Sequence, residues 1–470
     1  MKIAFIHYHL KTGGVTTCLK QQLEALKNDC HMCVITGELP PTSFPVNIIH
    51  IPELAYTSVY RKPFEPADVA AAVVRKIRDH FDGPCDIVHV HNPLLAKNSK
   101  FLDILKALQK RGLHLLLQVH DFAEDGRAQL YYKEGYPADC HYCVVNSRDY
   151  RILLKSGLKK PGLHQLFNCV SSPQIPPKAV AEEPLVVYPI RAIRRKNIGE
   201  ALLWSLLLGD EIKLSITLPP NSAPDIASYK SWKVFAANHR LRVEFDSGLN
   251  RPFENIVCSA HSLLTTSITE GFGFSFLEPW LFDKFVWGRK LPDICIDFES
   301  RGVDLDHMYT QLMVPIEGFD SKGFFSQWRK TIKVAARIYG VQIDPAQIQD
   351  AYDAITENDM IDFGLLGEKF QKQVLQYLLS ERAYMQKLLS VNPLLSNFGS
   401  TTAHKDIIKS NRNAVADNYH MAQYRENLLK LYAQVVATSV RQRIDKKKLL
   451  AAFFDLNRFS LLKWGVDDPQ

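Results

Sequence analysis

The feature that most constrains the fold is an alternation of short apolar runs with longer helix-like stretches, which occurs twice along the 470 residues. In the first series the run at 2–8 is followed by the amphipathic stretch at 15–26, and the pattern then repeats. Parallel strands buried on both faces read as nearly continuous apolar runs, and helices connect them. The alternation therefore predicts an α/β protein with doubly wound parallel sheets.

Two series of elements are predicted. The first has strands over 2–8, 31–37, 86–91, 113–120, 144–147 and 165–169, with helices over 15–26, 67–80 and 100–111. The second has strands over 185–189, 213–218, 241–245, 262–267 and 285–287, with helices over 197–208, 255–260 and 275–282. The proline-rich stretch at 171–178 is a linker candidate between them.

From about 320 onward the pattern changes to long helices, with helical periodicity over 370–389 and 421–438. The expected organisation therefore has four parts. They are an N-terminal Rossmann-like domain over 1–175, a second one over 180–300, a helical insertion over 301–415, and a closing helix with a basic C-terminal helix over 416–470.

Charge and apolar content exclude several classes of protein. The net charge of +7 suits anionic ligands such as nucleotide diphosphates or an anionic membrane surface, but it is too small and dispersed to indicate nucleic acid. The longest apolar run, at 201–208, is far shorter than the roughly 20 residues of a membrane span. With no apolar stretch of signal-peptide type at the N-terminus, we expect a cytoplasmic protein.

Nine cysteines are scattered along the chain, which fits a reducing compartment better than a disulfide framework. Two Cys-x-x-Cys pairs, Cys30/Cys33 and Cys140/Cys143, have the spacing of a four-thiolate zinc site. Each pair, however, enters an apolar β-like run, where cysteine serves as a small hydrophobe. We therefore expect packing rather than metal binding from these cysteines.

In the first series, candidate site residues follow the strands. Gly13 and Gly14 lie between the first strand and a helix, where glycine lets the backbone approach a diphosphate; the alternative is a tight turn without a ligand. His120 and Asp121 end a later strand, and the imidazole can hydrogen-bond a sugar hydroxyl or a phosphate. The full Gly-x-Gly-x-x-Gly fingerprint of dinucleotide enzymes is absent here.

Two more histidines, His89 and His91, alternate along one strand and so share a face of the sheet. We expect His89 to be packed and His91, at the strand end, to be able to face the ligand. A metal role for this pair is the weaker interpretation.

The second series carries a basic motif after its first strand. Arg191 and Lys196 stand five residues apart, and two fixed cations there can neutralise a leaving diphosphate. Arg194 and Arg195 lie between them, so the choice of cation is open on sequence grounds. A solvated basic loop is the alternative.

The segment Glu270-Gly-Phe-Gly-Phe-Ser-Phe-Leu-Glu278 follows a strand of the second series. Gly271 and Gly273 let the chain turn and expose backbone N–H groups, and a helix is expected from about Phe274. A carboxylate such as Glu278 can grip two vicinal ribose hydroxyls. The alternative is a tight turn with a helix-stabilising glutamate.

Taken together, these motifs resemble the retaining family 4 of the GT-B fold glycosyltransferases. The matching motifs occur in the family's order, as Gly13-Gly14, His120-Asp121, Arg191 with Lys196, and Glu270 with Glu278. Weaker matches are Val144–Ser147, Phe167–Val170 and the closing-helix segment 418–432. The resemblance covers about 1–300 and resumes at 418; it implies two Rossmann-like domains facing across a cleft, with a large helical insertion and C-terminal region.

The resemblance also implies roles. Gly14 would contact the donor diphosphate, His120 the transferred sugar, and Glu278 the ribose. Arg191 and Lys196 would hold the diphosphate, while Glu270 and the amides of Phe272 to Phe274 would orient the sugar. The expected partners are a nucleotide-sugar donor and a hydroxyl acceptor, with no cofactor and no metal required.

The sequence departs from the family after Glu278, where large side chains replace a stretch of small residues and Pro292-Asp-Ile replaces a Gly-Gly pair. Substrate identity is therefore open. A hexosyltransferase acting on a small soluble acceptor, such as a sugar or a glycerate-type compatible solute, is the first hypothesis. Transfer to a membrane lipid or polysaccharide is the alternative, and a non-catalytic sugar-nucleotide-binding protein is a third.

The C-terminal segment 441–464 combines basic residues with leucines and phenylalanines. A basic amphipathic helix of this kind can make weak peripheral contact with an anionic membrane. The alternative is a helix that packs on the N-terminal domain and leaves its basic face in solvent. Donor base, linkage position and oligomeric state leave no motif in the chain.

Overall fold

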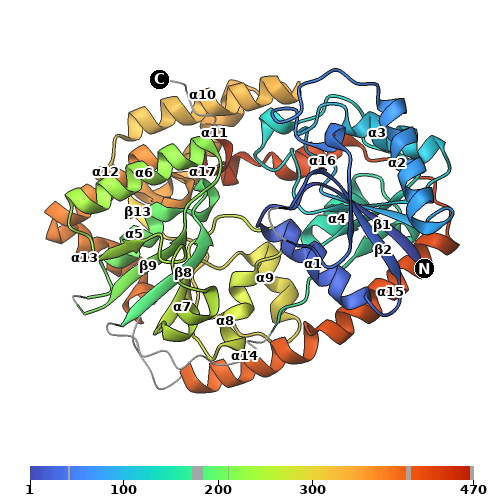
Figure 1. The fold of residues 1–470 in the computed structure, drawn as a ribbon. Helices are drawn as coiled ribbons and strands as arrows, with labels where there is room; N and C mark the ends of the chain where they lie inside the picture. The colour runs from blue at the N-terminus through green and yellow to red at the C-terminus, as the bar shows by residue number, and fades with distance from the viewer. Residues whose placement is uncertain (41–42, 172–183, 210, 398–403, 466–470) are drawn as a thin grey trace. The chain divides into compact units, whose positions relative to one another are not determined.

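The computed structural model describes residues 1–40, 43–171, 184–209, 211–397 and 404–465 (Figure 1). The chain divides into two compact units. Unit 1 combines Met1–Cys169 with Tyr419–Phe454, and unit 2 combines Val170–Asn418 with Asp455–Gln470. Each unit contains one parallel sheet with helices around it, as the alternation in the sequence predicts.

Unit 1 has a seven-stranded sheet of order β3-β2-β1-β4-β5-β6-β7. Its strands are β1 Lys2–His9, β2 His31–Glu38, β3 Asn47–His50, β4 Ile87–His91, β5 Leu115–Val119, β6 His141–Val144 and β7 Leu163–Gln165. Its helices are α1 Gly14–Leu26, α2 Pro66–Phe81, α3 Phe101–Lys110, α4 Ser147–Lys155, α15 Met421–Ala437 and α16 Lys446–Phe453. The third strand, β3, was not among the predicted strands.

The alternation of side chains along each strand separates two apolar clusters, one on each face of this sheet. Ala4 and Ile6 of β1 join the cluster covered by α2, α3, α4 and α16, whereas Ile3 and Phe5 join the cluster covered by α1 and α15. Helix α15 thus returns from a point far along the sequence to complete unit 1.

The same separation decides the interpretation of the cysteine pairs. Cys33 and Cys140 belong to one cluster, and Cys30 and Cys143 belong to the other. In addition, β2 and β6 are separated in the sheet by β1, β4 and β5, a distance of about 19 Å at ~4.8 Å per strand. The two pairs therefore do not form a four-thiolate site, and the expected packing role is confirmed.

The basic C-terminal segment does not form one exposed amphipathic helix. Leu449 and Phe453 of α16 are buried in unit 1, and Lys446 donates to the backbone of Tyr132 and lies over the Tyr131 ring, 3.9 Å from its centroid. The later helix α17, Leu461–Trp464, belongs to unit 2. Of the two interpretations of this segment, the structure therefore agrees for α16 with the helix that packs on the N-terminal domain. In the described part of the chain no helix is long and apolar enough to cross a membrane.

Unit 2 has a five-stranded sheet of order β10-β9-β8-β11-β12. Its strands are β8 Leu185–Arg191, β9 Lys213–Leu218, β10 Val243–Phe245, β11 Ser262–Thr265 and β12 Val286–Gly288. The helices between and after them are α5 Ile198–Ser205, α6 Ala223–Asn238, α7 Phe253–Ser259, α8 Glu278–Leu281 and α9 Pro292–Glu299. Strands β8 and β11 are neighbours, so the loops that follow them open at the same edge of the sheet.

The remainder of unit 2 is mainly helical, as the periodicity after 320 predicts. Its helices are α10 Ser321–Tyr339, α11 Pro345–Ile355, α12 Glu368–Ser380, α13 Arg382–Val391 and α14 His404–Asn418. A small antiparallel sheet of β13 Met313–Pro315 and β14 Met360–Asp362 joins them. Helix α11 starts with a capping box of Asp344 and Gln347, which satisfies two of its free N–H groups.

Candidate active site

The centre of the candidate site in unit 2 is an ion pair between Lys196 and Glu270. Lys196 ends the short 3-10 helix η4, Arg194–Lys196, which follows β8, and its Nζ donates to a carboxylate oxygen of Glu270 after β11. Burial alone would raise the pKa of Glu270, but the charges of Lys196 and Arg195 hold it below its ordinary value. The structure therefore brings together the ammonium and the carboxylate that the sequence placed 74 residues apart.

Three residues that the sequence analysis did not single out hold the Lys196 backbone in place. The Tyr188 hydroxyl donates to the Lys196 carbonyl at 2.8 Å, and Thr266 Oγ1 donates to the same carbonyl at 3.1 Å. Ser267 Oγ lies 3.0 Å from the Tyr188 hydroxyl. Polar side chains inside otherwise apolar strands were the available signal, since a buried hydroxyl needs a partner.

A buried polar network continues from this loop into the helical segment. Asn197 has a positive φ of 52°, and its side chain donates to Glu200 and accepts from Gln371. Arg289 binds Glu200 at 3.0 and 2.6 Å and Asp362 at 2.8 and 2.7 Å. The side chain of Arg289 is only 4% exposed. Residues of α12 and β14 therefore support the loop that carries Lys196.

The basic residues around Lys196 separate by their contacts. Arg191 Nη1 donates to the Pro219 carbonyl at 3.0 Å and is half-buried. The Arg194 backbone N–H donates to Asp225 at 3.1 Å, and its guanidinium lies 3.8 Å from the same carboxylate. Arg195, in contrast, acts electrostatically on Glu270. The sequence left open which of these basic residues acts beside Lys196. The contacts point to Arg195, which acts on Glu270, whereas Arg194 is bound to Asp225.

The glycine-containing turn after Glu270 differs in detail from the helix predicted over 275–282. Gly273 has a φ of +95°, and a Cβ there would approach Phe276 to 2.8 Å, so glycine is needed at this position. A 3-10 helix, Phe274–Phe276, follows, and α8 begins only at Glu278. Pro279 at the first turn of α8 is suited to a helix start and cannot continue a preceding one.

Glu278 is half-buried at the start of α8. Burial raises the pKa of its carboxyl group to about 7. Among the described residues no hydrogen bond or ion pair satisfies this carboxyl. A partly accessible carboxyl without a protein partner is suited to receive hydroxyl groups of a ligand.

In unit 1 the turn at Gly13 and Gly14 leads directly into α1. A Cβ at either glycine would meet nothing within 4 Å. The packing of unit 1 therefore does not require glycine there, and the space beside the turn is open to a ligand. This is the open backbone that diphosphate recognition needs.

His120 and Asp121 lie directly after β5. Asn92, with a positive φ of 54°, accepts from both backbone N–H groups, and its amide donates to Asp121 at 3.1 Å. Arg127 binds the other oxygen of Asp121 at 2.7 Å. Asp121 is thus held inside unit 1, whereas burial lowers the pKa of His120 to about 4 and keeps its ring neutral at neutral pH.

The imidazoles of His89, His91 and His120 form a stack. The ring centroids of His89 and His91 are 4.7 Å apart, and those of His91 and His120 are 5.4 Å apart. His89 is completely buried and contacts the Tyr432 hydroxyl at 2.9 Å, which confirms its expected packing role. His91 is also completely buried; its Nδ1 lies 3.1 Å from Nε2 of His120.

The chain is similar to several known proteins in sequence or in structure. No protein-family model matches the chain. The mannosylglucosyl-3-phosphoglycerate synthase of Petrotoga mobilis is 24% identical over 428 residues, which cover 82% of each protein. The structure is similar to that of Anabaena HepE in complex with UDP and glucose, with a TM-score of 0.56, 12% identity, and coverage of 92% of this chain and 99% of that chain.

Sucrose-phosphate synthase from Thermosynechococcus elongatus gives a TM-score of 0.55 at 14% identity, covering 93% of this chain and all of the other. This chain contains two parallel sheets, one after the other in the sequence. The similarity to both solved structures extends over nearly the whole length of those chains, and together these observations identify the architecture. The chain has the GT-B fold. The fold inferred from the sequence motifs is therefore confirmed.

Within the GT-B fold the sequence-predicted residues fall into two sets. Unit 2 contains Arg191, Lys196, Glu270 and the turn through Glu278, and unit 1 contains Gly13, Gly14, His120 and Asp121. Both sets follow carboxyl ends of strands, which is where parallel sheets bind ligands.

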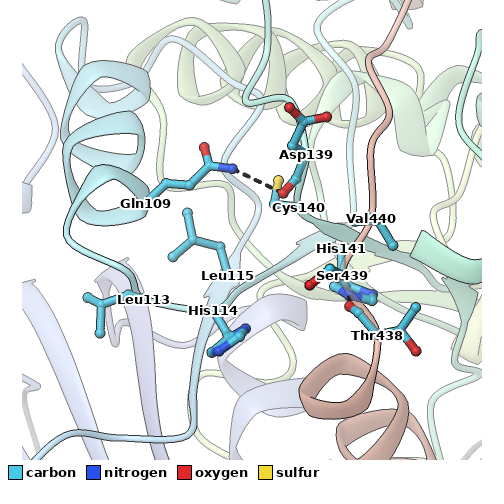
Figure 2. Close-up of a pocket in the computed structure, with 10 residues that line it drawn as sticks. All are labelled: Gln109, Leu113, His114, Leu115, Asp139, Cys140, His141, Thr438, Ser439 and Val440. Atoms are coloured by element: carbon cyan, nitrogen blue, oxygen red, sulfur yellow. Dashed lines mark hydrogen bonds between the residues drawn. The ribbon is translucent and has the colours of Figure 1, made fainter.

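A separate pocket of about 220 Å³ in unit 1 lies at the opposite, amino-terminal edge of the sheet. Figure 2 shows it between the starts of β5 and β6, at Leu115 and His141, and the segment 438–440. His141 Nε2 lies 2.8 Å from the Thr438 carbonyl there, and its Nδ1 lies 2.8 Å from His164. We assign this pocket to the anchoring of the chain between α15 and α16 and not to the candidate active site.

Proposed function

We propose that the chain is a retaining glycosyltransferase that moves a hexose from a UDP- or GDP-linked donor to a small soluble acceptor, such as a sugar or a glycerate-type solute. The observation that carries the proposal is the Lys196–Glu270 pair at the carboxyl edge of the sheet in unit 2. The relative from Petrotoga is named for a phosphoglycerate product, and HepE binds UDP, glucose and UDP-glucose, which supports both the reaction and the acceptor class.

Breaking the anomeric C–O bond produces an oxocarbenium-like sugar and a highly charged diphosphate. In the proposed mechanism Lys196 and Arg191 stabilise the diphosphate as its charge develops, a contribution of several kcal/mol for preorganised cations. Arg195 adds to the positive potential at the same place. We propose that these cations take the part that a metal plays in other transferases, so that turnover requires no metal and no cofactor.

Glu270 accepts a hydrogen bond from Lys196 and is thereby oriented toward the sugar, together with the backbone N–H groups of Phe272 to Phe274. The unpaired carboxyl of Glu278 receives the ribose hydroxyls of the donor. Gly14 approaches the diphosphate, and the neutral ring of His120 hydrogen-bonds the transferred sugar. The acceptor oxygen attacks on the face that the leaving phosphate occupied, and the phosphate takes its proton, so the configuration is retained without a protein nucleophile.

The nine cysteines are all unpaired, which supports the proposal of a reducing, cytoplasmic location. The proposed acceptor is a soluble molecule and not a lipid or polysaccharide. No motif or contact among the described residues selects a lipid or polysaccharide acceptor over a soluble one, and the burial of the apolar face of α16 removes one reason to favour a lipid.

A donor and acceptor screen tests the proposal. The protein is incubated with UDP- and GDP-hexoses, each with free sugars, glycerate-type acids, and lipid or polysaccharide acceptors, and nucleotide release is followed. We expect release that depends on one soluble acceptor class. Release with lipid or polysaccharide alone would replace the acceptor assignment. Donor binding without release for any combination would contradict enzymatic function and favour a binding protein.

A further inference from the structure

Three side chains with metal-ligating atoms converge in unit 1, and one of them, His120, is the residue expected to contact the sugar. Cys18 belongs to α1, His91 ends β4, and His120 follows β5. One donor atom from each lies within 4.8 Å of the donor atoms of the other two. These residues are distant in sequence, and the pairing of β4 with β5 and the packing of α1 on the sheet bring them together.

A second observation points to a ligand at this cluster. His91 is completely buried, and its Nε2 has no hydrogen-bond partner among the residues that the structure describes. In protein interiors, N–H groups without a partner are rarer than acceptors without one. We therefore place the proton of His91 on Nδ1, donating to His120 Nε2 at 3.1 Å, and a free lone pair on the buried Nε2.

The chemistry of the three groups selects the kind of ion. Two neutral imidazoles and a sulfur ligand are preferred by borderline and soft metals, above all Zn²⁺, and not by Mg²⁺ or Ca²⁺. In tetrahedral zinc sites the ligand atoms are about 3.3 to 3.6 Å apart, as the Zn–N and Zn–S bond lengths require. Because the donor atoms lie within 4.8 Å of one another, the cluster has to contract by up to about 1.2 to 1.5 Å to hold the ion.

The protonation states suit a metal that displaces a proton. Burial lowers the pKa of His91 well below its usual value and that of His120 to about 4, so both rings are neutral at neutral pH. Burial raises the pKa of Cys18 to about 12, so the group is a thiol until a metal replaces its proton. The thiol now donates to Asn168 Oδ1 at 3.1 Å, and its sulfur also contacts the Tyr424 hydroxyl at 3.7 Å and the Gln118 amide nitrogen at 3.9 Å.

We propose that Cys18, His91 and His120 form a three-ligand site for Zn²⁺, with a fourth position open to water, and that the bound ion inhibits the protein. On binding, one Zn–S bond and two Zn–N bonds form, the S–H bond of Cys18 breaks, and its proton passes to solvent. The hydrogen bond from His91 Nδ1 to His120 Nε2 also breaks, because His120 Nε2 gives its lone pair to the ion. The ion removes His120 from the sugar. Metal binding stands independently of the proposed function, whereas inhibition rests on it.

The binding test needs neither donor nor acceptor. Protein freed of metal by a chelator is titrated with Co²⁺, and the near-ultraviolet band of a cobalt–thiolate bond is recorded; Zn²⁺ is then added in competition with a chromophoric chelator. We expect one ion per chain, a thiolate band, and loss of that band in Cys18→Ser with binding at least about tenfold weaker, since even outer-shell changes cost 10- to 100-fold. Cys33→Ser, a buried cysteine in the other apolar cluster, is the matched control and should bind as the unmodified chain does.

Absence of stoichiometric binding, or equal binding by Cys18→Ser, would overturn the site. If Cys18→Ser does not fold by circular dichroism, His91→Gln serves in its place and should weaken binding to the same degree. Inhibition is measured separately: Zn²⁺ should reduce nucleotide release reversibly, and Cys18→Ser should be insensitive to it. Binding without inhibition would contradict the inhibitory role, and a chain that binds Zn²⁺ but never releases nucleotide would contradict the proposed function while supporting the site.

Discussion

At the residue scale, the two glutamates of the candidate donor site differ in whether the protein supplies a partner for the carboxyl group. Glu270 is paired with Lys196, and its pKa is lowered despite burial. Glu278 lacks such a partner, and burial raises the pKa of its carboxyl to about 7. One carboxylate is thus kept charged by the protein, while the other has no hydrogen-bond or ion-pair partner among the described residues.

Replacing Lys196 removes the cation expected to stabilise the leaving diphosphate. We expect Lys196→Ala to lower turnover at least ~100-fold, because a single preorganised group of this kind contributes roughly 3 to 4 kcal/mol to the transition state. The measurement is steady-state nucleotide release. Lys233→Ala, which removes a lysine of unit 2 that is paired with Asp246, should keep near-normal turnover. Normal turnover in Lys196→Ala would remove this residue from the mechanism.

Glu278→Ala should also lower turnover by at least ~100-fold through the lost ribose contacts.

The raised pKa of Glu278 makes a second, independent prediction about stability. Between the usual glutamate pKa of 4.5 and the folded value of about 7, the unfolded chain ionises this group while the folded chain keeps the proton. The unfolded state binds fewer protons in this window, so stability falls as the pH rises through it.

The substitution Glu278→Gln replaces the carboxyl with a neutral group of similar shape, so the variant does not lose this stability as the pH rises. We expect it to be more stable than the unmodified chain by about 1 to 3 kcal/mol at about pH 8, and to be nearly equal in stability below the usual glutamate pKa. Urea unfolding at the two pH values measures the difference. A variant that is less stable at the higher pH would show that an unrecognised partner stabilises the ionised carboxylate.

At the element scale, buried polar residues join segments that are far apart in the sequence. The Arg289 side chain links β12 to α5 through Glu200 and to β14 through Asp362. We expect Arg289→Met to destabilise unit 2 by about 3 to 5 kcal/mol, because two buried carboxylates lose their counter-ion. The triple variant Arg289→Met/Glu200→Gln/Asp362→Asn should recover most of the loss in urea unfolding. A single variant that unfolds like the unmodified chain would contradict this.

The segment between α15 and α16 depends in the same way on Gln442. Its amide donates to the Cys140 and Gly162 carbonyls at 2.8 and 2.9 Å, and its oxygen accepts from the Lys159 N–H at 2.8 Å. Gln442→Ala leaves these three backbone groups unpaired, and we expect a loss of about 2 to 4 kcal/mol in the stability of unit 1. The exposed neighbour Arg443→Ala should change stability by less than about 0.5 kcal/mol. Equal effects of the two substitutions would contradict the anchoring role.

Some helices and strands of this fold could be predicted from the sequence, and others could not. The long buried strands and the amphipathic helices were predicted because their apolar periodicity is strong. Strands β13 and β14 have three residues each, too few to show a period, and pair only through contacts distant in sequence. The helix predicted over 275–282 is interrupted because the positive φ of Gly273 and the ring of Pro279 determine the local backbone.

Only some residues of the candidate site could be predicted from the sequence. Lys196, Glu270 and Glu278 stand next to strand ends and carry recognisable chemistry. Tyr188, Thr266 and Ser267 act through a backbone carbonyl, and Arg289 acts through a network that closes only in three dimensions. The local pattern can mark a buried polar residue, but it does not identify the partner that the residue binds.

At the scale of the whole molecule, the surface of the C-terminal segment bears on the choice of acceptor. The apolar side chains of α16 are buried, and Lys447 and Lys448 are the exposed basic residues of its first turn. Because each lysine near an anionic surface contributes only about 1 kcal/mol, we expect no stable membrane association. Flotation with anionic and neutral vesicles measures this. Recovery of the protein with anionic vesicles at about 0.15 M salt would restore a membrane role.

The central claim is that this GT-B chain transfers a sugar from a nucleotide donor with retention, using preorganised cations in unit 2. The most direct measurement is proton NMR of the anomeric signals while UDP- or GDP-hexose reacts with a soluble acceptor. We predict that a new anomeric signal with the configuration of the donor appears together with the free nucleotide diphosphate, and that Lys196→Ala suppresses both. A product of inverted configuration, or a donor that stays intact with every acceptor, would contradict the account.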